Sequence, residues 1–382
     1  MRPTIPDTQT VEAVIVGAGM VGLTLAQALA CAGIEVAVID RTDPASFTDA
    51  AFDGRTSAVA AASARVLDGI GLWRDLAPRA CPIDTIRVSD GDALMFLHFD
   101  HAEVGADPLG HILENRDIRG SLLEKAAASP RIAIYAPANI EVTTRDRGGA
   151  TIALDDGRAI RARVILACDG RGSGYRRAAG IPAAEWRYDQ SSFVCAIAHE
   201  RPHGNIAHER FLPGGPFAIL PMTDNRSSIV WTEKSDLAPD MLALDDATFA
   251  AELKDRFGAF LGEVRVGRHA AFLVAFANVT RVRERLGPLG PRALAAVLRR
   301  GLQRRARNPG PDQPARAPPL ADPRRWCTQD GCPSCGGSKP GTLVAGDPKY
   351  FRVITSKAQL QMSQFQEIVQ TAVGMSPQAS TP

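Results

Sequence analysis

The stretch from Val11 to Asp40, VEAVIVGAGMVGLTLAQALACAGIEVAVID, decides the fold that we predict for this chain. Its β-branched run Val14–Val16 predicts a short buried strand. Met20 to Ala32 then carries Leu, Ala and Gln at helical spacing, and Gly33 stands where a helix commonly ends. Glu35–Ile39 is a second apolar run. These three elements form one βαβ unit, so the sequence predicts a parallel sheet.

The turn between the first strand and the helix carries three glycines, Gly17, Gly19 and Gly22, in the spacing G-x-G-x-x-G. In that spacing the first glycine permits a tight turn, the second lets a diphosphate approach the main chain, and the third lets the helix pack against the strand. Free N–H groups at the helix start favour a bound anion. Asp40 is placed to accept hydrogen bonds from the ribose of an adenine nucleotide, and Arg41 follows it in the same predicted site. We therefore predict dinucleotide binding, with a purely structural turn as the alternative.

The bulk composition is ordinary, but the charge is unevenly distributed. The 382 residues suffice for two domains, and 45% are hydrophobic. The formal net charge is +2, yet residues 281–326 hold twelve arginines, no lysine and three acids, a local +9 that leaves −7 for the rest. Such a block indicates a separate tail. Scattered cysteines, no apolar leader and no apolar run of bilayer length favour a cytoplasmic protein.

Beyond the opening unit, apolar periodicity predicts helices over Ser57–Leu72, Asn115–Ala128 and Phe249–Phe260. After Ile181 the pattern changes to alternating strands, which indicate an antiparallel sheet in a second domain. From Ala277 onward this regular pattern is lost.

Four motifs resemble the flavin-dependent aromatic hydroxylases, and most closely the branch that hydroxylates ubiquinone precursors. They are DGRTSAVAAASARVLDGIGLW (Asp53–Trp73), LENRDIRGSLLEKAA (Leu113–Ala127), ILACDGRGSGYRRAAGI (Ile165–Ile181) and FLPGGPFAILPM (Phe211–Met222). The resemblance covers roughly residues 10–275. It implies an α/β fold: a Rossmann-like FAD-binding domain over 1–180, a substrate domain with a mixed or antiparallel sheet over 181–276, and an atypical tail over 277–382.

The resemblance also implies a set of site residues. Arg55 and Arg116 would lie near FAD, where a guanidinium can bind the diphosphate or stabilise reduced flavin; the alternative is a solvated surface arginine. Asp169-Gly170 would meet ribose or nicotinamide-cofactor groups, with a simple turn as the alternative. A substrate-side wall, with ordinary hairpin chemistry as the alternative, would be shaped by Pro213, Gly214, Gly215 and Pro221.

The chemistry that the resemblance implies belongs to the cofactor. NADH or NADPH reduces FAD, and O₂ then supplies the oxygen that enters an activated phenol ring, here an aromatic or polyprenyl-phenol substrate. A polyprenyl substrate suits a cytoplasmic enzyme that associates peripherally with the inner membrane face. We predict no catalytic side chain and no metal, and we give His203 and His208 no role.

The family's late flavin element, a strand ending Gly-Asp followed by a Gly-rich helix entry, is missing where it is expected, soon after Phe276. VAGDPKYF (Val344–Phe351) contains Gly-Asp but comes too late. We hypothesise that the reading frame changes between about Arg265 and Thr280. Reading the nucleotide sequence in the other two frames tests this. We therefore expect weak flavin binding and low activity.

Other interpretations of the tail stay open. Ala293–Arg307 has the pattern of a basic amphipathic helix that could lie on anionic lipid. Nucleic acid is disfavoured, because no aromatic residues are interleaved with the arginines. Cys327, Cys332 and Cys335 have metal-like spacing but lack a local fourth ligand. The rival functions are a flavin- or NAD-dependent dehydrogenase and an inactive remnant that binds membrane or nucleic acid through its basic tail.

Overall fold

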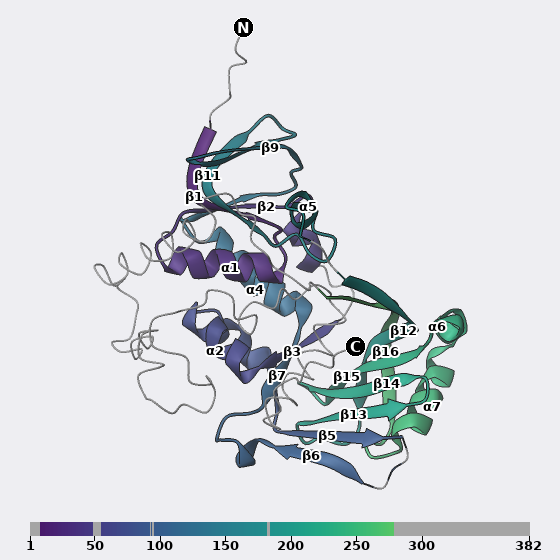
Figure 1. Ribbon diagram of the computed structural model, residues 1–382. Helices are drawn as coiled ribbons and strands as arrows, with labels where there is room; N and C mark the ends of the chain where they lie inside the picture. The colour runs from purple at the N-terminus through teal and green to yellow at the C-terminus, as the bar shows by residue number, and fades with distance from the viewer. Residues whose placement is uncertain (1–7, 49–54, 92, 94, 182–183, 279–382) are drawn as a thin grey trace, which may run out of the picture.

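The computed structural model describes residues 8–48, 55–91, 93, 95–181 and 184–278. The interpretations of the tail, including the predicted helix over Ala293–Arg307, the three late cysteines and VAGDPKYF, lie outside these residues. The described chain forms three sheets. A six-stranded sheet with its helices makes one half of the molecule, and a seven-stranded sheet makes the other (Figure 1).

The six-stranded sheet has the order β8-β2-β1-β11-β10-β9, and its first four strands are parallel. The βαβ unit expected from the sequence is β1, α1 and β2, with β1 at the centre of the sheet, so the predicted parallel pairing is confirmed. The last two strands, β10 and β9, join antiparallel to β11. The bounds are β1 Thr8–Val16, β2 Val36–Ile39, β8 Ile132–Tyr135, β9 Ile140–Asp146, β10 Gly149–Leu154, β11 Ala159–Ala167, and α1 Met20–Cys31.

Apolar side chains hold α1 (Met20–Cys31) to one face of this sheet. Leu23, Ala26 and Leu29 are buried against Ala13 and Ile15 of β1, together with residues of α4 (Asn115–Ala127). Full burial of one such leucine contributes roughly 1.5–3 kcal/mol. The two helices lie side by side in Figure 1. The N-terminus of α1 follows the glycine turn directly, and the N-terminus of α4 carries Arg116, so both helix starts belong to the predicted nucleotide site.

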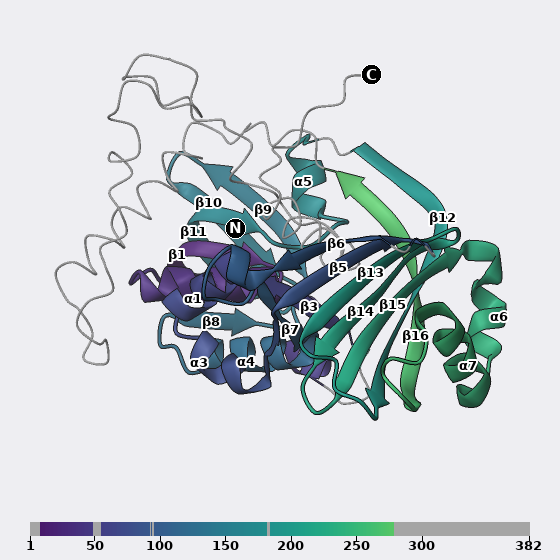
Figure 2. The same cartoon turned by 90° about the horizontal axis from the view of Figure 1, so that it is seen from below.

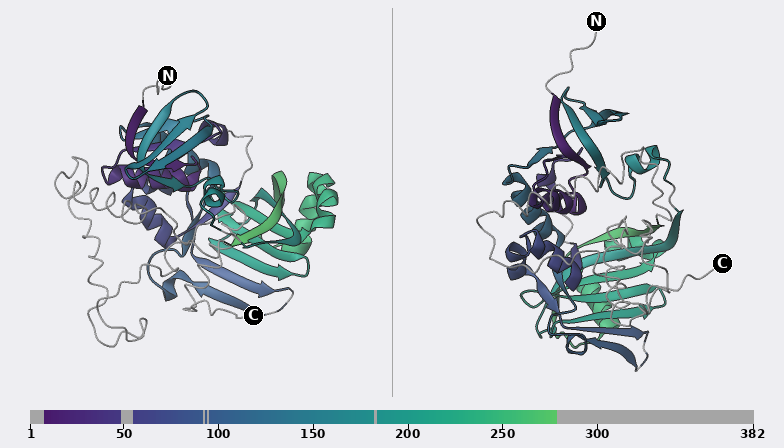
Figure 3. Two further views of the ribbon diagram at one scale, coloured as in Figure 1. Left: turned by 45° about the horizontal axis from the view of Figure 1, so that its top comes forward. Right: turned by 60° about the vertical axis from the view of Figure 1, so that its left-hand side comes forward.

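A small three-stranded sheet, β3-β7-β4, stands between the two large ones (Figure 3). It consists of β3 (Thr56–Ala60), β4 (Cys81–Ile83) and β7 (Gly110–Glu114). The helix predicted over Ser57–Leu72 is therefore wrong in its first four residues: α2 spans Ala61–Gly69, and the preceding residues pair with β7. Pairing with a strand more than fifty residues away overrides local helical periodicity there. The short helix α3 (Trp73–Leu76) follows.

The seven-stranded sheet has the order β16-β12-β15-β14-β13-β5-β6 and is mostly antiparallel. Two of its strands, β5 and β6, come from early in the chain, and β5 runs parallel to β13. The sheet is thus not one continuous segment, and the boundary near residue 180 stays a prediction. Its strands are β5 Thr85–Asp90, β6 Phe96–Asp100, β12 Ala184–His199, β13 Ile206–Leu212, β14 Gly215–Met222, β15 Arg226–Lys234 and β16 Val264–Asn278.

The two faces of this sheet have different coverings. We call the face that packs on the three-stranded sheet the inner face; there Ala218, Leu220 and Val230 meet Ala58 and Ile112. The opposite, outer face is covered by α6 (Ala238–Ala243) and α7 (Asp246–Phe257), as Figure 2 shows. Its core contains Phe193, Phe217, Ile219, Trp231, Phe249 and Leu253. Strand alternation assigns the side chains of β5, β13 and β14 to one face or the other.

Candidate functional site

The glycine turn after β1 has a different steric demand at each glycine. Gly17 has φ +108°, and a Cβ there would lie 2.3 Å from the Cys168 carbonyl oxygen. A Cβ on Gly22 would lie 1.8 Å from the Gly17 carbonyl oxygen. Gly19, which caps the start of α1, has open space around its Cβ position. Two glycines therefore close the turn, and the third leaves room where a ligand can approach the helix N-terminus.

Asp40, at the end of β2, points its carboxylate at this turn. One oxygen, Oδ2, accepts a hydrogen bond from the Ala18 N–H at 2.6 Å, and Oδ1 accepts one from the Thr42 N–H at 2.8 Å. The carboxylate thus fastens the turn to the neighbouring strand. Each oxygen keeps a further lone pair, so a ribose hydroxyl can still donate to it. Arg41 beside it is exposed.

A second positively charged region forms where β3 begins and α4 starts. The Asn115 N–H donates to the Arg55 carbonyl at 2.8 Å, which ties the two segments together. Burial, and secondarily the charge of Arg119, lowers the pKa of Arg55 to about 10. Burial also lowers the pKa of Arg119. Arg119 is buried and Arg55 half-buried, and both guanidinium groups stay charged at neutral pH.

Arg116, in the first turn of α4, forms an ion pair with Glu114 at 2.7 Å. Glu114 also accepts from Arg226 of β15 at 2.9 Å. Nearby, the Thr56 hydroxyl donates to the Ser228 hydroxyl at 2.9 Å. Glu114 therefore links α4, which packs on the six-stranded sheet, to the seven-stranded sheet. Its position in the sequence did not reveal this role.

Asp169, which follows β11 (Ala159–Ala167), is engaged by its own loop. Its carboxylate accepts hydrogen bonds from the Ser173 hydroxyl and, at 2.8 Å, from the Gly174 N–H at the start of α5 (Gly174–Ala178). Gly170 has φ +84° and open space around its Cβ position. This arrangement favours the turn interpretation for Asp169, and contact with a nucleotide stays a prediction.

The predicted substrate-wall residues are divided by the sheet. Pro213-Gly214 forms the tight turn between β13 and β14, where Gln190 Nε2 donates to the Gly214 carbonyl at 2.9 Å. Gly215 has φ +150°, which favours glycine. Pro221 stands between Leu220 and Met222 of the inner face, so strand alternation points it to the outer face. A substrate-side role for these four residues stays a prediction.

Glu209 of β13 is a buried ionisable residue that the sequence analysis did not single out. It shares the inner face with Ala207 and is only 5% exposed, and its Oε1 has no hydrogen-bond partner among the described residues. Burial raises the pKa of Glu209 to about 8. The side chain is therefore largely protonated at neutral pH. The sequence offered one sign of this burial: Glu209 is two residues from the apolar Ala207 in a strand pattern, so both side chains point to the same face.

The His203 side chain is engaged by its own surroundings. His203 Nε2 donates to the Met222 carbonyl at 2.8 Å, and its Nδ1 accepts from the Asn205 N–H at 3.0 Å. In the described ranges no three His, Cys, Asp or Glu side chains gather as a metal would require. Over the same ranges, no helix is both long and apolar enough to cross a membrane.

The comparisons with known proteins agree with this architecture. The family described as FAD binding domain matches residues 10–285, and the chain belongs to that family. It is 45% identical over 284 residues to the ubiquinone hydroxylase UbiL of Rhodospirillum rubrum, a match that covers 74% of this chain and 66% of that protein. It is 33% identical to the 3-demethoxyubiquinol 3-hydroxylase of Escherichia coli, covering 67% of this chain and 66% of that protein.

A solved structure has the same fold. The crystal structure of pqsL, a probable FAD-dependent monooxygenase from Pseudomonas aeruginosa, matches with a TM-score of 0.61 at 21% identity, over 72% of this chain and 76% of that chain. The predicted resemblance to flavin-dependent hydroxylases and the predicted fold class are thus confirmed. This chain spans about two thirds of the length of the curated relatives named above.

Proposed function

We propose that this protein is a FAD-dependent monooxygenase that uses NADH or NADPH and O₂ to hydroxylate the ring of a polyprenyl phenol in ubiquinone biosynthesis. The observation that carries the proposal is the glycine turn: two closed glycines and one open glycine at the start of α1. The similarity to ubiquinone hydroxylases supports the substrate class.

The residues around the turn fit the adenine-diphosphate part of FAD. The open side of Gly19 leaves room for a diphosphate at the N-terminus of α1, where the helix dipole favours negative charge. Asp40 would accept a hydrogen bond from the ribose, and Arg55 with Arg119 would face the anionic parts of the cofactor. When bound, FAD would supply the transfer of electrons from the nicotinamide to O₂.

The inner face of the seven-stranded sheet would hold the substrate ring. Phe211 is 46% exposed there, next to the Pro213-Gly214 turn, so an apolar surface is available beside the hairpin. Glu209 lies on the same face and, because burial raises its pKa to about 8, would add no charge at neutral pH. A neutral wall suits a ring that carries a polyprenyl chain and excludes water from the reacting atoms.

Flavin binding gives the first test. The full-length chain is titrated with FAD, and the quenching of flavin fluorescence and the visible spectrum are recorded. Because the late Gly-Asp element is missing, we expect weak saturable binding. Gly19→Ala should weaken it about tenfold or more, because a methyl group takes the space of a phosphate oxygen. Gly105→Ala is the matched control, since that glycine also has open space around it. Equal FAD affinities for the two variants would refute the proposed cofactor site.

Reaction type is tested with FAD in excess. A monooxygenase forms hydroxylated phenol only when O₂ is present and incorporates one atom of ¹⁸O₂ into the product. Product that forms equally without O₂ would instead identify a dehydrogenase. A chain that binds no FAD but binds anionic vesicles in a strongly salt-dependent way would support the inactive remnant.

A further inference from the structure

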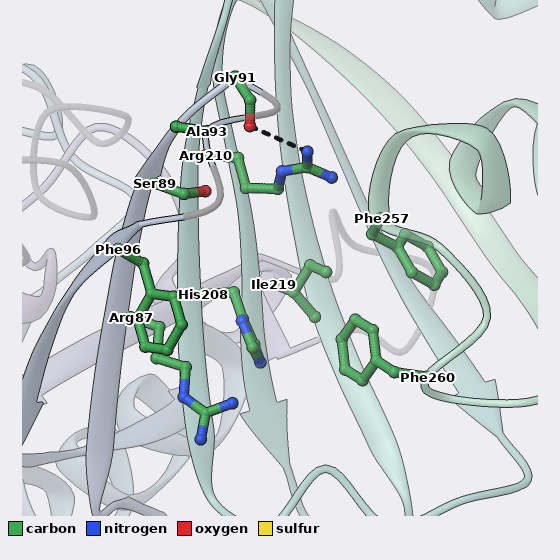
Figure 4. Close-up of a pocket in the computed structure, with 10 residues that line it drawn as sticks. All are labelled: Arg87, Ser89, Gly91, Ala93, Phe96, His208, Arg210, Ile219, Phe257 and Phe260. Atoms are coloured by element: carbon green, nitrogen blue, oxygen red, sulfur yellow. Dashed lines mark hydrogen bonds between the residues drawn. The ribbon is translucent and has the colours of Figure 1, made fainter.

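The outer face of the seven-stranded sheet carries a cavity of its own. It has a volume of about 350 Å³, within the usual size range of small-molecule sites, and it lies where β5, β6, β13 and β14 meet the end of α7 (Figure 4). Side chains of the outer face make its floor, among them Arg87, His208 and Ile219. Their strand neighbours Val88 and Ala218 belong to the inner face. The cavity is therefore separated by the sheet from the proposed flavin and substrate surfaces.

The cavity contains a cation without a counter-ion. Arg87 has neither a hydrogen bond nor an ion pair with any described residue, and its Nε is buried without a partner. Its guanidinium carbon lies 5.4 Å from the centre of the Phe96 ring. Arg210, by contrast, is held by the main chain: it donates to the Gly91 carbonyl at 3.0 Å and to the Arg256 carbonyl. Among the described residues, the lining of the cavity includes no acidic side chain.

His208 faces Arg87 on the neighbouring strand, in register. Burial, together with the charges of Arg87 and Arg210, lowers the pKa of His208 to about 4. The imidazole is therefore neutral at pH 7 and carries one N–H that can donate. Its ring centre lies 5.0 Å from that of Phe260. The site thus offers one positive charge, on Arg87, and one neutral N–H donor, on His208. This combination suits a ligand with a single negative charge better than a ligand with two.

The rest of the lining is aromatic. Phe96 stands on one side, and Phe257 and Phe260 stand on the other, with Ile219 on the floor between them (Figure 4). Phe257 and Phe260 meet edge to face at 5.8 Å. Inorganic phosphate would leave these apolar surfaces without a partner. A flat ring gains both area burial and ring contacts here.

We infer that this outer cavity binds a small aryl carboxylate. Its carboxylate pairs with the planar fork of Arg87 and accepts the N–H of His208, while its ring packs between Phe96 and Phe260. The site lies across the sheet from the proposed catalytic surface and does not depend on flavin binding.

Calorimetric titration of the full-length chain with naphthoate tests this site. Neutral naphthamide and inorganic phosphate serve as the two comparison ligands. We expect one naphthoate per chain, with both comparison ligands at least about tenfold weaker. Arg87→Gln should weaken naphthoate about tenfold or more, because it removes a charge-assisted hydrogen-bonded pair. Arg87→Lys keeps the charge but loses the fork, so it should give a smaller loss.

Arg65→Gln is the matched control, because Arg65 is exposed on α2 in the other half and has no partner among the described residues. Its affinity for naphthoate should equal that of the unchanged chain. Naphthoate binding that survives both Arg87 substitutions would overturn the inference, since the ligand would then occupy another surface. Phosphate binding as tight as naphthoate would also overturn it, because the aromatic lining would then contribute nothing.

Discussion

Replacing Glu209 by glutamine should change the pH dependence of stability in a way that only a buried carboxyl can produce. Burial raises the pKa of Glu209 from 4.5 to about 8. The folded state therefore binds a proton that the unfolded state has lost between these pH values, so stability falls as pH rises from 4.5 to 8 and is constant above. At about 1.4 kcal/mol per pH unit, this difference amounts to at most about 5 kcal/mol. That is a large share of the total stability of a typical protein, about 5–15 kcal/mol.

Glu209→Gln has the same shape but cannot ionise. Urea unfolding, followed by tryptophan fluorescence at a series of pH values, should give equal free energies for the variant and the unchanged chain near pH 4.5. The variant should then become the more stable of the two by several kcal/mol at pH 9. Glu141→Gln, at an exposed position on β9, is the control and should show no such divergence. Parallel curves for Glu209→Gln and the unchanged chain would refute the burial argument.

Two further substitutions test the packing around the proposed site. Gly22→Ala should abolish folding or lower the melting temperature by roughly 10 °C or more in a thermal scan. The reason is that the alanine Cβ would lie 1.8 Å from a main-chain carbonyl oxygen. A melting temperature equal to that of Gly105→Ala would contradict this. Arg226→Gln should cost about 1–2 kcal/mol in urea unfolding, because it removes one of the two cations that pair with Glu114; an unchanged midpoint would show that the pair contributes nothing.

The βαβ unit could be predicted because its information is local. A β-branched run, a glycine turn and a helical apolar pattern follow each other directly, and the structure has them in that order. Thr56–Ala60 could not be predicted in this way. Its strand conformation depends on pairing with Gly110–Glu114, more than fifty residues later. The joining of β5 to β13 is likewise a long-range pairing, which leaves no mark in either segment alone.

The steric requirements of the glycine turn could be predicted from the sequence, whereas the hydrogen-bond partners of the side chains could not. The spacing of Gly17 and Gly22 states a steric need, and the structure has that need at both positions. The carboxylates of Asp40 and Asp169 accept hydrogen bonds from nearby N–H groups, which the sequence did not reveal, and their contact with a nucleotide stays a prediction. The sequence shows which strand a carboxylate follows, but it does not show which hydrogen-bond donors surround that carboxylate. Motif order likewise does not give strand phase, so the face on which Pro221 lies could not be predicted from the sequence.

Glu114 makes the two halves of the molecule depend on each other. It ends β7 and immediately precedes α4, and it pairs with Arg226 of the seven-stranded sheet as well as with Arg116 in the first turn of that helix. A buried carboxylate is costly without partners, so a displacement of β15 that withdraws Arg226 must be balanced at Arg116. Arg119 follows one turn along the same helix and acts on Arg55. Glu114 and its two arginine partners therefore connect the seven-stranded sheet directly to the first turn of α4.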